Sequence, residues 1–179
     1  MAKYSDIKGF TVQTLSSDTV ASQAAGGSWA SGGSLSTART SAQSSGSGND
    51  NAILAGGYLA GASPTSQSAC ESYNGTAWTE VSNLNTAGFT RAGSIESSTA
   101  ALAMGGWSPA LPGALDNTEL WNGSSWTETA DLSTARGYGS GAGTSTAGIT
   151  FGGYTNTPIA TTEEFTASGA DSTREFDLS

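Results

Sequence analysis

The sequence has no histidine and a single cysteine, and these two scarcities exclude much of the chemistry that side chains support. Without histidine, a Ser-His-Asp triad or a Cys-His pair is impossible, and the commonest metal ligand is missing. One cysteine, Cys70, allows no disulfide within the chain. We therefore expect no catalytic residues, no metal site and no cofactor, and we expect Cys70 to be a small buried residue.

Positive charge is also scarce, because six Lys and Arg residues stand against 15 Asp and Glu, for a formal net charge of −9. Binding to nucleic acid depends on Lys and Arg contacts to phosphate, so we expect no nucleic-acid partner. No apolar run has the length needed to span a bilayer, so we expect no membrane insertion. The first residues lack the apolar core of a signal peptide, which predicts synthesis in a cytoplasm without a cleaved leader.

What the chain has instead is a motif that occurs three times, an apolar run followed by a glycine pair and an aromatic residue. The glycine pairs begin at positions 56, 105 and 152, and the aromatic residues are Tyr58, Trp107 and Tyr154. Steps of 49 and 47 residues indicate a repeated supersecondary unit. We expect each pair where the backbone must approach another segment closely, at a crowded axis or a bulge.

A second set of features recurs in phase with the glycine pairs. Trp29, Trp78 and Trp126 are spaced by 49 and 48 residues, and each is followed by Leu-(Ser/Asn)-Thr-Ala. Asn-Gly lies upstream of two of these tryptophans, between paired aromatic residues. This dipeptide predicts a tight hairpin in which both central residues adopt φ > 0.

One glutamate and one arginine also occur once in each unit. The glutamates are Glu71, Glu119 and Glu163, and the arginines are Arg39, Arg91 and Arg136. Equivalent positions of a repeat lie far apart, so the glutamates are not expected to form an acid–base pair. We expect each glutamate to pair with an arginine across neighbouring units.

One unit is predicted to contain four short strands, the first of them at roughly 40–46, 88–95 and 136–142. The second strand is the apolar run, and the hairpin supplies the third and fourth. Four-stranded antiparallel units repeated around an axis are typical of β-propeller blades. The hydrophobic run, the Gly-Gly pair and the spaced aromatic and Trp resemble the kelch repeat of β-propellers, from Trp29 to about Phe165. The resemblance implies an all-β fold with three kelch-like blades per chain.

The two ends of the repeat region are incomplete in complementary ways. The third unit reaches Phe165 but has no Trp at the position near Ala170 that matches Trp126, and Trp29 has Ala24 in place of an upstream aromatic. Propellers have about 4–8 blades, so we expect a homodimer with six blades in which Trp29 of one chain packs beside Phe165 of the other. The alternative is an open β-stack or prism, capped by neighbours in a larger assembly.

The loops between the second and third strands carry all four prolines and differ in length. Variable loops on one face of a rigid scaffold commonly bind partners, although ordinary stiffened turns would look the same. Their large apolar side chains would be exposed unless a partner covers them. The candidate partner- or glycan-binding residues are Tyr58, Leu59, Trp107, Leu111, Leu115, Tyr154 and Ile159.

The chain divides into a lead-in segment over 1–28, the repeats over 29–170 and a tail over 171–179. The lead-in is either a frayed terminus with a stray strand or an anchor that docks on another protein. The candidate anchor residues are Tyr4, Ile7, Phe10, Val12 and Leu15.

The lead-in followed by Ser/Thr/Gly-rich kelch-like units also resembles virion proteins of tailed phages, those of marine phages in particular. That resemblance implies a non-enzymatic structural or adhesion component of the virion, such as a head decoration or a tail or fibre protein. The alternative is a propeller that binds a glycan or receptor on the host surface through Tyr58, Trp107 and Tyr154. Open ring faces favour stacking on sugars, whereas burial between blades favours a structural role.

Overall fold

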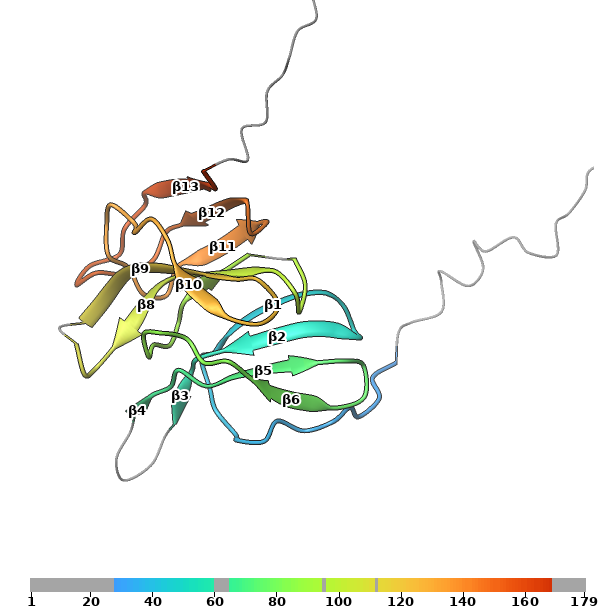
Figure 1. The fold of residues 1–179 in the computed structure, drawn as a ribbon. Coiled ribbons are helices and arrows are strands. Elements are labelled where there is room, and N and C mark those ends of the chain that lie inside the picture. The colour runs from blue at the N-terminus through green and yellow to red at the C-terminus, as the bar shows by residue number, and fades with distance from the viewer. Residues whose placement is uncertain (1–27, 60–64, 95, 112, 169–179) are drawn as a thin grey trace, which may run out of the picture. The chain divides into compact units, whose positions relative to one another are not determined.

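The computed structural model describes residues 28–59, 65–94, 96–111 and 113–168, and its strands form an all-β fold. The strands pair antiparallel in three sheets and one separate hairpin (Figure 1). None of the described residues belongs to a helix with the length and apolar character needed to cross a membrane. The tail over 171–179 and the candidate anchor lie outside the described residues, the anchor residues being Tyr4, Ile7, Phe10, Val12 and Leu15.

The three sheets follow the repeat. Sheet 1 contains β1 (Gln43–Gly48), β2 (Asn51–Ala55), β5 (Cys70–Tyr73) and β6 (Trp78–Val81), in that order. Sheet 2 repeats this order with β7 (Ala92–Gly93), β8 (Ala101–Ser108), β9 (Gly113–Trp121) and β10 (Trp126–Glu128). Sheet 3 contains β11 (Ser140–Gly143), β12 (Ala147–Phe151) and β13 (Thr162–Thr166) within the described residues. The separate hairpin is formed by β3 (Tyr58–Leu59) and β4 (Thr65–Ser66).

The first strand of each sheet begins later than the sequence predicted. A residue with positive φ stands two positions before each of these strands: Ser41 (54°), Thr90 (53°) and Tyr138 (59°). The left-handed conformation interrupts an extended backbone. The strands therefore start at positions 43, 92 and 140, after this turn.

The hairpins between the third and fourth strands are confirmed, but their turns differ from the prediction. Tyr73 pairs with Trp78, and the four residues between them form the loop. Only Gly75 in this loop has positive φ, at 91°. The side chain of Asn74 closes the loop instead, because its Oδ1 accepts the N–H groups of the second and third residues that follow it, each at 3.0 Å.

Each glycine pair makes the close backbone approach that the sequence predicted. In sheet 2, Gly105 and Gly106 have φ of 59° and 126°, and the register of β8 shifts between Met104 and Gly106. The N–H of Gly106 donates to the carbonyl of Arg136 at 2.7 Å. A Cβ added to Gly105 would lie 2.5 Å from that same carbonyl oxygen. The pair is thus a bulge that holds β8 against the linker between sheets 2 and 3.

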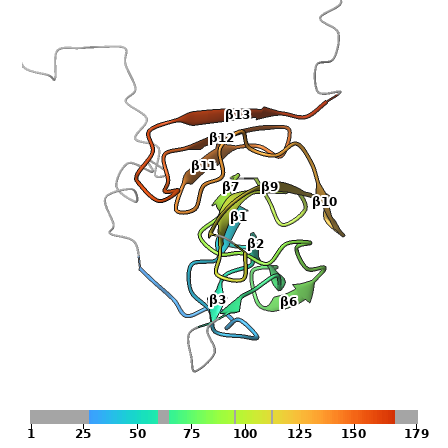
Figure 2. The ribbon, with the colours of Figure 1, turned by 90° about the vertical axis from the view of Figure 1, so that its left-hand side faces the viewer.

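Neighbouring sheets meet along their first strands, with β7 between β1 and β11 (Figure 2). Gly93 of β7 faces the Gln43 side chain of β1, and a Cβ on Gly141 of β11 would lie 2.6 Å from the carbonyl oxygen of Gly93. Glycine at these two positions lets three strands from three sheets come into direct contact.

Hydrophobic side chains from successive sheets share common clusters. The larger cluster joins sheets 1 and 2 and consists of Ile53, Ala55, Cys70, Leu84, Ala101, Ala103, Trp121 and Trp126. A smaller one joins sheets 2 and 3 and consists of Ala92, Leu102 and Met104, with Leu120 and Phe165 packed against it. Cys70 is 1% exposed, so its predicted burial is confirmed.

Candidate functional site

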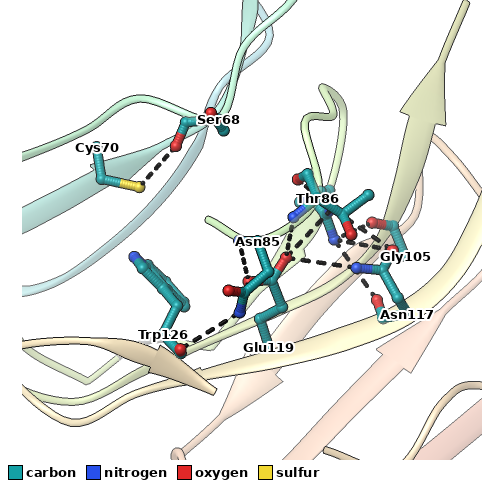
Figure 3. Close-up of polar contacts among 9 residues, drawn as sticks. Ser68, Cys70, Asn85, Thr86, Gly105, Asn117, Glu119 and Trp126 are labelled. Carbon is teal, nitrogen blue, oxygen red and sulfur yellow. Dashed lines mark hydrogen bonds and ion pairs between the residues drawn. The ribbon is translucent and has the colours of Figure 1, made fainter. Parts of the chain in front are cut away.

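Each recurring glutamate holds the linker that enters its own sheet, as Figure 3 shows for Glu119. The backbone N–H groups of Asn85 and Thr86 donate to its carboxylate at 2.7 and 3.1 Å. The guanidinium of Arg91 lies 3.8 Å from the same carboxylate, and both side chains are fully buried. One carboxylate therefore satisfies two backbone donors of the linker and compensates a buried cation.

The other two glutamates make equivalent contacts. Glu71 accepts the N–H of Ser36 at 2.9 Å and pairs with Arg39 at 2.5 Å, and Glu163 pairs with Arg136. All three predicted ion pairs are present, but the prediction that they join neighbouring units is wrong. Each arginine stands just before the first strand of the sheet that carries its glutamate, and the linker backbone supplies the connection to the preceding sheet.

These groups have the properties of structural residues. Burial raises the pKa of the Cys70 thiol, and the indole of Trp126 is among the weaker groups that oppose this shift, so the nucleophilic thiolate is disfavoured. Burial also acts to raise the pKa of Glu163, but hydrogen bonds from Ser133 and Arg136 outweigh it and lower that pKa. In the part of the chain that the structure describes, no three His, Cys, Asp or Glu side chains are placed to hold a metal ion.

Five aromatic rings form a continuous row across the three sheets. We call this row the aromatic strip; its members are Tyr58, Phe89, Trp107, Tyr138 and Tyr154. Tyr58 and Phe89 have centroids 5.0 Å apart, Phe89 and Tyr138 6.5 Å, and Tyr138 and Trp107 6.3 Å. Trp107 and Tyr154 complete the row at 6.1 Å. These spacings are those of favourable tilted and edge-to-face pairs.

Backbone pairing fixes the strip on the sheets. The aromatic residue after each glycine pair forms an isolated antiparallel bridge with the adjacent linker, joining Thr40 to Tyr58, Phe89 to Trp107 and Gly137 to Tyr154. The strip is most open at sheet 3, where Tyr138 is 58% exposed and Tyr154 is 38% exposed. The other three rings are half-buried. The strip thus combines a fixed backbone with ring surface that solvent reaches.

The structure brings together the three aromatic residues that the sequence singled out, Tyr58, Trp107 and Tyr154. It does so through Phe89 and Tyr138, which the sequence analysis missed. Phe89 stands two residues before the arginine of its unit, whereas Tyr138 stands two residues after its own. The two rings therefore occupy different repeat positions, and periodicity gave no reason to group them.

The apolar residues of the loops behave differently from one another. Leu111 is 48% exposed, as predicted, and Leu59 and Ile159 are half-buried. The prediction for Leu115 is wrong, because its side chain is only 7% exposed. β9 begins at Gly113, so the loop ends earlier than expected and Leu115 lies inside the strand.

No protein-family model and no curated protein sequence matches this chain. Among solved structures, the chain is similar to the structure of YjhT, with a TM-score of 0.63 and 16% sequence identity. The match covers 75% of this chain and 44% of the YjhT chain, so the chain spans less than half of that protein. At this identity the likeness concerns the fold alone.

Proposed function

We propose that this chain is a non-enzymatic adhesion protein that contacts its partner through the aromatic strip. The exposed rings of the strip carry this proposal. Large aromatic side chains lose little conformational freedom on binding and provide much of the energy of protein interfaces. Tyr138 and Tyr154 offer such side chains on a surface held by backbone bridges.

We further propose that the three sheets are propeller blades and that two chains build one ring of six. The repeated strand order and the contact between first strands support this arrangement. A propeller has about 4–8 blades, and this chain covers only 44% of the YjhT chain whose fold it shares.

The absence of an enzymatic role is likewise a proposal, and the pairing of the three recurring glutamates supports it. Each of these carboxylates is bound to the arginine of its own unit and to linker N–H groups, so none of these three is free to act in an acid–base pair. The sequence, moreover, contains no histidine.

The setting proposed for this adhesion is a tailed-phage virion, with the protein as a head decoration or a tail or fibre component. The lead-in segment over 1–28 would dock on another virion protein, as the resemblance of the lead-in and composition to phage proteins implies. In a density gradient of particles purified from a culture that produces this protein, the chain should sediment with intact virions. Recovery of all the protein in the particle-free fraction would contradict the virion assignment.

The alternative function is binding of a host glycan or receptor. The exposed ring of Tyr138 supports this alternative, because a sugar could stack on it. On a printed array of bacterial surface oligosaccharides, this function predicts that the wild-type protein binds at least one sugar. Tyr138→Ala and Tyr154→Ala should then each weaken binding by about tenfold or more, because each removes a stacking face. Phe151→Ala is the matched control, since it removes an exposed aromatic outside the strip.

Affinities for this comparison are measured by calorimetry with a monovalent sugar, so that the number of chains per particle does not alter the result. If no sugar on the array binds, the glycan alternative is rejected and a protein partner remains. If both tyrosine variants bind as tightly as the wild type, the strip is not the binding surface.

A further inference from the structure

A slot of about 190 Å³ lies at the boundary of sheets 2 and 3. Its lining includes Met104 and Thr118 of sheet 2, Leu132 of the linker and Phe165 of β13. β13 is the last strand of sheet 3 within the described residues, whereas sheets 1 and 2 each continue with a fourth strand.

The equivalent position in sheet 2 is filled by Trp126 of the fourth strand. Its ring packs against Trp121, with centroids 5.3 Å apart, in a cluster that includes Cys70 and Leu84. The counterparts of Trp121, Cys70 and Leu84 one repeat later are Phe165, Thr118 and Leu132. The slot is therefore the sheet-3 equivalent of the Trp126 site, and its lining also includes the acidic residues Asp131, Glu163 and Glu164.

Thr118 also offers this slot a polar partner. Its side chain is 1% exposed, and its Oγ1 has no hydrogen-bond partner among the described residues. In the sheet-2 site the indole of Trp126 lies beside the thiol of Cys70, but its Nε1 makes no hydrogen bond among the described residues (Figure 3). A buried hydroxyl without a partner is costly, and an indole N–H entering the slot would satisfy it.

Trp29 has the sequence position that such an occupant requires. It stands six residues before Leu35, the same spacing as from Trp78 to Leu84 and from Trp126 to Leu132. The linker that follows Trp29 is bound to Glu71 of sheet 1 through Ser36 and Arg39. By this spacing, Trp29 corresponds to the fourth-strand tryptophan of a repeat unit before sheet 1, and its side chain is exposed.

Hydrogen bonds between the linkers form a row whose two ends are complementary. The N–H of Thr90 donates to the carbonyl of Ser41 at 2.7 Å, and the N–H of Tyr138 donates to the carbonyl of Thr90 at 3.0 Å. Within the described residues, the N–H of Ser41 and the carbonyl of Tyr138 have no such backbone partner. Among the residues that the structure describes, one end of this row is thus a donor and the other an acceptor, and sheet 2 lies between them. Complementary ends of this kind are suited to join two copies of a chain head to tail.

The glycine pairs show the same open end. A Cβ on Gly56 or Gly105 would lie 2.5 Å from a carbonyl oxygen of the next linker, that of Gly88 or Arg136. At Gly152 the nearest atom to an added Cβ is 3.8 Å away, the carbonyl oxygen of Ile159 in the loop between β12 and β13. The equivalent carbonyl for Gly152 is that of Arg39, which begins sheet 1.

We propose that the slot between sheets 2 and 3 binds the indole of Trp29 from a second copy of this chain. The ring packs on Phe165, its N–H donates to Thr118 Oγ1, and the linker of the incoming chain lies over Gly152. Two such contacts close a dimer. This inference rests on the propeller architecture proposed above, but not on ligand binding by the aromatic strip.

Light scattering and native mass spectrometry test the proposal on the full chain. The wild type should have the mass of two chains and a tryptophan emission spectrum in which Trp29 is shielded. Trp29→Ala should keep its circular dichroism spectrum and raise the dimer dissociation constant by about 100-fold or more, since a buried tryptophan is a typical interface hot spot. A wild type that remains monomeric at about 100 µM, or a Trp29→Ala variant that dimerises normally, would overturn the proposal.

Two further variants separate this contact from a general loss of structure. Thr118→Val keeps the side-chain shape and should weaken the dimer by about three- to tenfold through loss of one hydrogen bond. Gly152→Ala adds a methyl group where only the second copy is close, and should weaken the dimer by about tenfold or more. Leu111→Ala, on an exposed loop, is the control and should dimerise as the wild type does.

A folded monomer in which Trp29 is shielded from acrylamide quenching would place the indole in the slot of its own chain and refute the exchange. Binding of a sugar or protein by the aromatic strip is read out separately. If the wild type does not dimerise but binds a sugar or protein through the strip, only this inference is contradicted. If the wild type dimerises but its strip binds nothing, only the adhesion function is contradicted.

Discussion

Replacing Glu119 with alanine is expected to lower the free energy of unfolding by about 3–5 kcal/mol, the range for breaking a buried ion pair on one side. The change leaves the guanidinium of Arg91 buried, where burial already lowers its pKa and the charge of Glu119 opposes that shift. It also removes the acceptor of the N–H groups of Asn85 and Thr86. Urea unfolding followed by tryptophan fluorescence measures the loss.

Glu128→Ala is the matched control for this variant. Glu128 lies on β10 of the same sheet and is exposed, so its removal should change the free energy of unfolding by no more than about 0.5 kcal/mol. Glu163→Ala should cost less than Glu119→Ala, because the Glu163 side chain is 19% exposed and water can replace part of what is lost. Equal effects at positions 119 and 128 would show that the carboxylate does not hold the linker.

Replacing Gly105 with alanine is expected to destabilise the fold by about 3 kcal/mol or more. The new side chain would have to adopt φ near 59°, which costs about 1–2 kcal/mol for an L-residue. Its Cβ would also lie 2.5 Å from the backbone carbonyl of Arg136, and the linker would have to shift. That shift would weaken the 2.7 Å hydrogen bond between Gly106 and Arg136.

Gly152→Ala separates the two components of this effect. Gly152 has nearly the same φ, 65°, but the nearest atom to an added Cβ is 3.8 Å away. Measured by thermal unfolding in a Trp29→Ala background, in which the dimer is not expected, Gly152→Ala should show the conformational cost alone. If both glycine variants lose the same stability, the close approach to Arg136 contributes nothing and the conformation accounts for the whole loss.

The repeat made the strand order of the sheets predictable, because the aromatic pairs, the Asn-Gly dipeptides and the glycine pairs each identify one place in the unit. The strand starts were not predictable in the same way. The φ values of Ser41, Thr90 and Tyr138 depend on hydrogen bonds between linkers, and these residues are not of the types that adopt such angles readily. The side chain of Asn74 closes its hairpin loop by accepting two backbone N–H groups, whereas the sequence predicted that a positive φ at Asn74 would form the turn.

For the candidate site, the sequence identified the three aromatic residues that follow the glycine pairs but not the strip that they form. Phe89 and Tyr138 enter the strip because their linkers run beside the preceding sheet, which is a tertiary contact with no repeat spacing. Leu115 was misassigned for a related reason. A proline-containing loop looks the same in sequence whether the strand resumes at position 113 or at 117.

Gly93 and Gly141 let the first strands of neighbouring sheets come into direct contact, and the angle at which such strands cross sets the rotation from one sheet to the next. In a head-to-tail assembly, this rotation has a consequence for growth. If six equal rotations make one full circle, the free donor end of one chain meets the free acceptor end of the other, and addition of chains stops. If they do not, the same ends keep adding chains and the product is a helical filament. Two positions without a side chain would then separate a particle of finite size from a fibre.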